Sequence, residues 1–220
     1  MEGAQATNNR ISALMNLKQL QINVDKSSFV LIGNTQHVKQ MRDLIKNNPI
    51  TFNNEEVKER TSEKYLGEQI HSEGLKKSVE DTVNKRYWRA ISAVMEIRTI
   101  LNDCRIHKVG GANAGISLWE GAVIPMVLNN AGVWTDIGQD TIDKLNKIRN
   151  VFLCHLLATP RTTPLPMLNW DSGCLPMEYR IMEEKLSLGF HISNLNPETL
   201  ANQILTIQKK YNFPVLMRKL

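Results

Sequence analysis

The stretch VEDTVNKRYWRAISAVMEIRTIL, residues 79–101, decides the fold class of this chain. Its apolar side chains recur at the spacing expected for one face of an α-helix. This pattern predicts a single amphipathic helix of roughly seven turns near the middle of the chain. The positions that share the apolar face are Val79, Val83, Tyr87, Ile91, Val94 and Leu101.

On the C-terminal side of this stretch the helical period continues. Pro125 is expected to disturb the first of the later helices. A cluster of prolines between residues 160 and 176 predicts an extended connection and not a helix. The later helices are expected at residues 116–127, 142–156, 178–190 and 197–209.

On the N-terminal side the period changes, and short β-rich pieces alternate with helical ones. The chain is therefore predicted to be α+β and mainly α, with a small antiparallel sheet followed by a helical bundle. We expect three parts, residues 1–72, 73–160 and 161–220. Within the first part we expect helices at 4–18 and 38–45, a hairpin of strands 20–24 and 29–32, and strands at 50–52 and 64–70.

Composition narrows the partners and the setting of the chain. The formal net charge of +5 and a pI near 9.1 favour an anionic partner. Three widely spaced cysteines without a CxxC predict neither a disulfide framework nor a zinc site, and they fit an intracellular setting, nuclear or cytoplasmic. A metal site would need Cys104 and His107 together with Cys154 and His155. Because Cys154 and His155 are adjacent in sequence, they cannot easily supply two ligands to one ion, and no metal site is expected. No apolar run reaches the roughly 18 residues that a membrane helix needs, so no membrane-spanning helix is expected.

The most informative motif is LQINVDKSSFVLIG, residues 20–33, followed about thirty residues later by Tyr65-Leu66-Gly67. In order and spacing these segments resemble the later palm motifs of non-LTR (LINE-type) retrotransposon reverse transcriptases. The resemblance extends from Ala4 to about Phe190. It implies that a remnant of the polymerase palm comes first and that a helical thumb follows.

The resemblance assigns roles to four residues of the N-terminal part. Lys26 matches a lysine thought to lie near the triphosphate, where an ammonium group can assist the departing pyrophosphate. Tyr65, Leu66 and Gly67 match the primer grip, a tight turn that approaches the nucleic acid. The alternatives are a solvated turn lysine beside Asp25 and an ordinary strand end.

The polymerase chemistry of that family depends on carboxylates that hold two Mg²⁺ ions. These include an adjacent Asp-Asp pair, and no such pair occurs in the 220 residues. The resemblance places it just before residue 1. We therefore expect the chain to be catalytically incompetent by itself, to hold no cofactor of its own, and to have the front half of the palm as a candidate partner. Alternatively, adjacent sequence supplies that half and the chain is part of an active enzyme.

The basic side chains of the long helix fit a thumb that follows the backbone of an RNA–DNA or DNA duplex. They are Lys85, Arg86 and Arg89. Against this, Asp81 lies four residues before Lys85, as on a merely solvated helix face. Trp88 is either a stacking platform or a packing residue, and Trp119, Trp134 and Trp170 are expected to pack.

Some positions depart from the commonest family pattern. Asn129, Gly132 and Cys154 stand where tyrosine, glutamate and arginine are frequent in the family. A decayed or repurposed helical scaffold without a nucleic-acid role therefore remains the alternative function.

Overall fold

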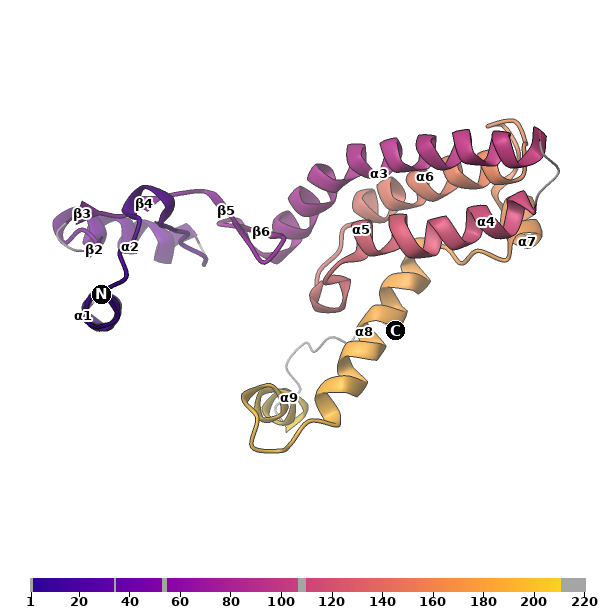
Figure 1. Cartoon of the computed structure of the whole chain (residues 1–220). Coiled ribbons are helices and arrows are strands. Elements are labelled where there is room, and N and C mark those ends of the chain that lie inside the picture. Colours follow the sequence, from indigo (N-terminus) through magenta and orange to yellow (C-terminus); the bar gives the residue numbers. More distant parts are fainter. Residues whose placement is uncertain (1, 34, 53–54, 107–109, 211–220) are drawn as a thin grey trace. The chain divides into compact units, whose positions relative to one another are not determined.

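The computed structural model describes residues 2–33, 35–52, 55–106 and 110–210. The chain forms two compact units, Met1–Ser78 and Val79–Leu220 (Figure 1). The segment after residue 160, which we expected to be a separate part, lies in the same unit as most of the long helix. The fold is α+β and mainly α, as predicted.

In the N-terminal unit, two helices accompany a set of very short strands. The helices are α1 (Glu2–Leu17) and α2 (Thr35–Asn47), close to the expected ranges. The strands pair two by two: β2 with β3 and β5 with β6 are antiparallel, and β1 with β4 is parallel. Their bounds are β1 Ser28–Phe29, β2 Thr51–Phe52, β3 Glu55–Glu56, β4 Lys58–Glu59, β5 Ser62–Tyr65 and β6 Glu68–His71.

The predicted hairpin of strands 20–24 and 29–32 is wrong. Residues Val24–Lys26 form a 3₁₀ turn, because the side chain of Asn23 accepts a hydrogen bond from the backbone N–H of Lys26 at 3.1 Å. Ser28 and Phe29 instead pair in parallel with Lys58 and Glu59. Local side-chain capping therefore outweighed the β propensity of the apolar residues.

The N-terminal unit has a very small core. Among its described residues only Val57 and Gln69 are buried. Apolar side chains of α1 are left outside, with Leu14 56% and Leu17 79% exposed. Hydrophobic burial therefore contributes little to the stability of this unit.

The second unit is built around α3, which spans Leu75–Ile106 and confirms the predicted long helix. After it come α4 (Gly111–Leu118), a π-helical turn (Trp119–Val123) and α5 (Ile124–Leu128). Pro125 has no N–H to donate, and the wider π turn lies directly before it. The expected disturbance at this proline is thus confirmed.

The remaining helices continue the bundle. They are α6 (Gln139–Leu156), α7 (Leu165–Ser172), α8 (Met177–Ser193) and α9 (Leu200–Lys210). The extended connection predicted for residues 160–176 is wrong over α7. Its Pro166 occupies the first turn, where a missing N–H costs nothing, and Gly173 ends the helix with φ of 64°.

The core of the helical unit lies between α3, α4 and α6. The rings of Trp119 and Phe152 stack with centroids 4.5 Å apart and an interplanar angle of 11°. Gly115 lets α4 approach closely, since a Cβ there would lie 2.8 Å from a methyl of Leu156. This packing fixes α3 and α6 side by side and so positions the surface between them (Figure 1).

Candidate functional site

Helix α3 turns one face into the core and one face outward. Val83 and Val94 are buried, whereas Lys85, Trp88 and Arg89 are exposed. Lys85 and Arg89 are four residues apart, which places their cationic groups one turn apart on the same side. The outward face of α3 is therefore basic beside an aromatic ring.

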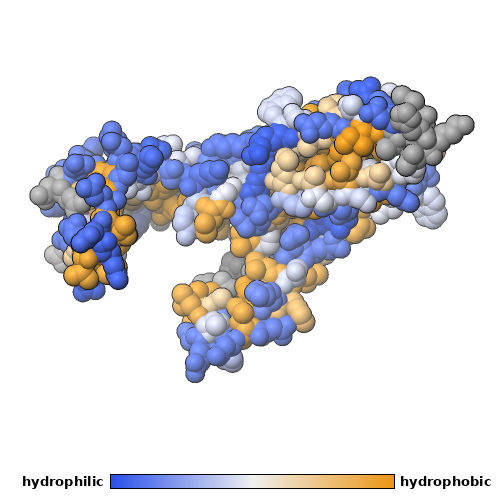
Figure 2. Space-filling model, viewed as in Figure 1, coloured by the Kyte–Doolittle hydropathy of each residue, from blue (hydrophilic) through white to orange (hydrophobic). Residues whose placement is uncertain are grey.

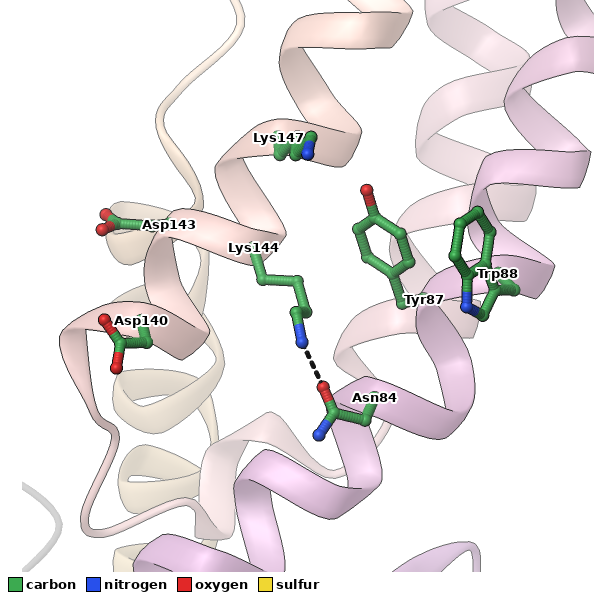
Figure 3. Close-up of a pocket in the computed structure, with 7 residues that line it drawn as sticks. All are labelled: Asn84, Tyr87, Trp88, Asp140, Asp143, Lys144 and Lys147. Atoms are coloured by element: carbon green, nitrogen blue, oxygen red, sulfur yellow. Dashed lines mark hydrogen bonds between the residues drawn. The ribbon is translucent and has the colours of Figure 1, made fainter.

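A groove with a volume of about 650 Å³ separates this part of α3 from α6 (Figure 3). Both helices contribute polar and aromatic side chains, and the groove is open to solvent. Such volumes are typical of sites that take small molecules or single residues of a polymer. Its lining residues are Asn84, Tyr87, Trp88, Asp140, Asp143, Lys144 and Lys147.

Lys144 crosses the groove from α6 to α3. Its ammonium donates to the side-chain oxygen of Asn84 and lies 5.9 Å from the centroid of the Tyr87 ring. The ring of Tyr87 meets that of Trp88 edge to face, with centroids 5.2 Å apart. These contacts hold a cation and two aromatic rings in fixed positions at the groove.

The charges of the groove are arranged unevenly. Figure 3 shows Lys144 and Lys147 extending from the side of α6 that faces Tyr87, whereas the carboxyl of Asp143 points away from α3. Asp143 also accepts a hydrogen bond from Gln139 at 2.9 Å. Within the described part of the chain, the side chain of Lys147 forms no hydrogen bond or ion pair. The side of the groove nearest the aromatic rings is therefore cationic.

Arg86 lies differently from its two basic neighbours. Its Nη1 donates to the backbone oxygens of Val127 at 3.2 Å and Asn129 at 2.9 Å, where α5 ends. Carbonyls at a helix C-terminus lack partners inside the helix, and an arginine there satisfies them. Arg86 thus ties α3 to the end of α5.

Lys26, expected near the triphosphate, is exposed at the end of the 3₁₀ turn in the N-terminal unit. Its backbone N–H is held by Asn23, so the turn is well defined even though the side chain extends into solvent. Asp25 precedes it in the same turn.

Tyr65, Leu66 and Gly67 form the tip of the hairpin between β5 and β6. The single strand predicted over residues 64–70 is wrong, because the chain reverses at Leu66 and Gly67. Both have positive φ, 48° and 91°, as a two-residue type I′ turn requires. Tyr65 is 63% and Leu66 75% exposed, so the tip presents a ring and an aliphatic side chain to solvent.

The structure thus brings Lys85 and Arg89 together on one helix face, with Arg86 on another face of that helix. Sequence reasoning missed Lys144 and Lys147 as members of the same site. A signal was present in the sequence. Lys144 directly precedes the buried Leu145 and Lys147 directly precedes the buried Ile148, so the two lysines, three residues apart, share one side of the helix next to its buried face. The pairing of α6 with α3 could not be deduced from either helix alone.

The tryptophans divide into two classes. Trp119 and Trp134 are each 2% exposed and pack as predicted. Trp170 is 89% exposed, so its expected packing role is wrong. Trp88 is 72% exposed at the edge of the groove, where it is available to a ligand.

Among the described residues no group of histidine, cysteine and acidic side chains could hold a metal ion. His107 and the side chain of Cys104, weighed as ligands above, lie outside the described residues. Nor is any described helix long and apolar enough to cross a membrane.

In comparisons with known proteins, no family model, no curated protein and no solved structure matches the chain.

Proposed function

We propose that this chain is the rear palm and thumb portion of a non-LTR retroelement reverse transcriptase, and that its retained capability is duplex binding. The observation that carries the proposal is the outward face of α3. Lys85 and Arg89 stand one turn apart, opposite a face fixed in the core by Val83 and Val94. A rigid helix with two outward cations suits phosphate contacts along a nucleic-acid backbone.

The charges and sequence motifs agree with this proposal. In the described part of the chain, the guanidinium of Arg89 forms no hydrogen bond or ion pair, so its charge is not neutralised internally. The net charge of +5 has the sign that counterion release requires. The tip at Tyr65, Leu66 and Gly67 is an exposed tight turn, which is compatible with a primer grip. Lys26 matches the family lysine through its sequence motif.

Polymerisation is not proposed for the chain by itself. Two-metal catalysis needs carboxylates that can share two cations, and the 220 residues contain no adjacent Asp-Asp pair. The N-terminal unit has a very small core, in which Val57 and Gln69 are the buried described residues. It is therefore a candidate to pair with the front half of a palm, which would cover its exposed strands.

The test is the salt dependence of binding to a blunt RNA–DNA duplex. The double variant Lys85→Ala with Arg89→Ala should weaken binding and reduce the slope of log affinity against log salt by about 2. Arg98→Ala is the matched control for single Arg89→Ala, since each removes one exposed arginine from α3. Absence of duplex binding at low salt, or equal effects of the two arginines, contradicts the proposal.

A second candidate function is a protein-interaction scaffold without a nucleic-acid role. Figure 2 shows hydrophobic side chains at the surface of the region that Figure 1 labels α8 and α9. Exposed apolar patches commonly mark protein contacts. The residues are Leu186, Phe190, Leu200, Ile204 and Ile207, of which Phe190 and Leu200 are more than 70% exposed. Indifference to duplex at every salt concentration would favour this candidate.

A further inference from the structure

Trp88 is placed unlike the tryptophans that build the core. It is 72% exposed, whereas Trp119 and Trp134 are each 2% exposed. Tyr87 meets its ring edge to face at an interplanar angle of 83°, which orients the indole without covering it. In the part of the chain that is described, its indole N–H has no acceptor. An aromatic ring held on a rigid helix in this way is suited to serve as a stacking platform.

Both helices carry cationic residues close to this platform. Arg89 follows Trp88 on α3, and Lys147 faces Tyr87 from α6 (Figure 3). Lys144, also on α6, donates to Asn84, and its ammonium lies 5.9 Å from the centroid of the Tyr87 ring. An exposed ring with cationic residues nearby suits a nucleic-acid strand, in which bases alternate with phosphates.

The internal base pairs of a double helix cannot stack on Trp88, because they are stacked on one another and present no free face. An unpaired nucleotide presents its face, and proteins commonly stack such bases on tryptophan or tyrosine. The groove volume of about 650 Å³ suits one or two nucleotides and not a helix of paired strands.

We propose that the groove between α3 and α6 binds an unpaired nucleotide of an RNA or DNA strand. Trp88 stacks on the base, and Lys147 and Arg89 contact the flanking phosphates. Lys144 stays with Asn84 and closes the floor of the groove. This inference rests on the proposed nucleic-acid role, but Trp88 and Lys147 belong to it alone.

The test compares three probes at low salt by fluorescence anisotropy. One is a blunt RNA–DNA duplex, the second carries a single-stranded extension of about eight nucleotides, and the third carries an abasic extension of the same length. Trp88→Ala should weaken binding of the extended probe about tenfold and change binding of the blunt duplex less than about twofold. Lys147→Ala should also weaken binding of the extended probe.

The controls separate stacking from loss of fold and from charge alone. Trp170→Ala removes an exposed tryptophan outside the groove and should leave all three affinities unchanged. Trp88→Phe keeps a ring and should retain most of the affinity that Trp88→Ala loses. Because the phosphates remain on the abasic probe, wild-type protein should bind it about tenfold more weakly than the base-bearing one.

Each outcome bears on one proposal or on both. Equal binding of the base-bearing and abasic extensions, or no effect of Trp88→Ala, overturns the nucleotide site while the duplex proposal stands. Binding of the extended probe alone, dependent on Trp88, supports the site and contradicts duplex binding. Displacement of the extended probe by poly-glutamate as readily as by single-stranded RNA assigns the groove to an acidic peptide and overturns the inference. Failure to bind any probe contradicts both proposals.

Discussion

Arg149 of α6 donates from Nη2 to the backbone oxygen of Cys174, 2.6 Å away, and so anchors the loop between α7 and α8. The same Nη2 donates to the side chain of Asn169 on α7. Arg149 is 2% exposed, and burial lowers the pKa of its guanidinium below the ordinary value. Its charge is balanced by carbonyl and amide dipoles, since no described carboxylate lies within ion-pair distance of it.

Replacing this arginine tests the anchor. Arg149→Met should lower the free energy of unfolding by about 2 to 4 kcal/mol, because the buried carbonyl of Cys174 and the half-buried side chain of Asn169 lose their donor. Arg149→Lys should recover little, since one ammonium cannot reproduce the planar fork. Urea unfolding followed by circular dichroism measures both. The exposed Arg98→Met serves as control, and a loss no larger than that of the control would contradict the anchoring role.

Gly132 is required by close packing against α8. A Cβ there would lie 3.0 Å from the backbone oxygen of Glu184 and 3.1 Å from Cβ of Leu188. Gly132→Ala should therefore destabilise the helical unit by about 1 to 3 kcal/mol. Gly121 is the matched control: it is helical, nothing lies within 4 Å of its Cβ position, and alanine there should stabilise by up to about 1 kcal/mol. The same sign for both variants in thermal unfolding would contradict the prediction.

The hairpin tip offers a pair of changes with opposite signs. Leu66 has φ of 48°, a conformation that costs a branched aliphatic residue about 1 kcal/mol or more. Leu66→Asn should protect the amides of β5 and β6 from hydrogen exchange, whereas Gly67→Ala, at φ of 91°, should expose them. Leu66→Ala is the control. Alanine also has a Cβ and meets the same backbone strain, so it should not protect these amides from exchange. Protection by alanine would show that the leucine side chain, and not the backbone conformation, destabilises the turn.

The acidity of Glu63 depends on a hydroxyl in the N-terminal unit. Ser28 Oγ donates to Glu63 Oε2 at 2.6 Å, and this bond, followed by the bond from the Lys64 N–H, lowers the pKa of the carboxyl. Because the folded pKa lies below the unfolded one, the ionised carboxyl stabilises the fold above about pH 4. This contribution is lost as pH falls through the folded pKa.

Ser28→Ala should raise the pKa of Glu63 toward its ordinary value in an NMR titration of the carboxyl carbon. Ser27→Ala is the control, because the Ser27 hydroxyl donates to the backbone oxygen of Asn23 and not to Glu63. An unchanged Glu63 titration in Ser28→Ala would show that the Ser28 hydroxyl is not the principal cause of the lowered pKa.

Sequence reasoning succeeded where periodicity extended over many turns. Helix α3 was predictable because buried apolar residues repeat along one face from Val79 through Val94 to Leu101. The 3₁₀ turn at Val24–Lys26 was not, since a single capping bond from Asn23 decides against a strand. Helix α7 was obscured by Pro166 and by the prolines that flank the helix, and its docking depends on Arg149, which is distant in sequence.

The candidate site likewise has features that the sequence revealed and features that depend on tertiary packing. The basic face of α3 with Lys85 and Arg89 was visible in the sequence. That Arg86 is engaged with the end of α5 could not be foreseen, because its acceptors lie more than forty residues further on. The groove needs α6 beside α3, and only tertiary packing brings Lys144 and Lys147 to Tyr87 and Trp88.

The distribution of tryptophans has a spectroscopic consequence. All four lie beyond residue 78, so intrinsic emission reports on the helical unit and not on the N-terminal unit. Trp119, stacked on Phe152, should emit at shorter wavelength and resist acrylamide quenching, whereas the exposed Trp88 and Trp170 should be quenched readily. Melting of residues 1–78 would therefore pass unseen by tryptophan fluorescence, and a full account of unfolding needs a second probe that follows the backbone.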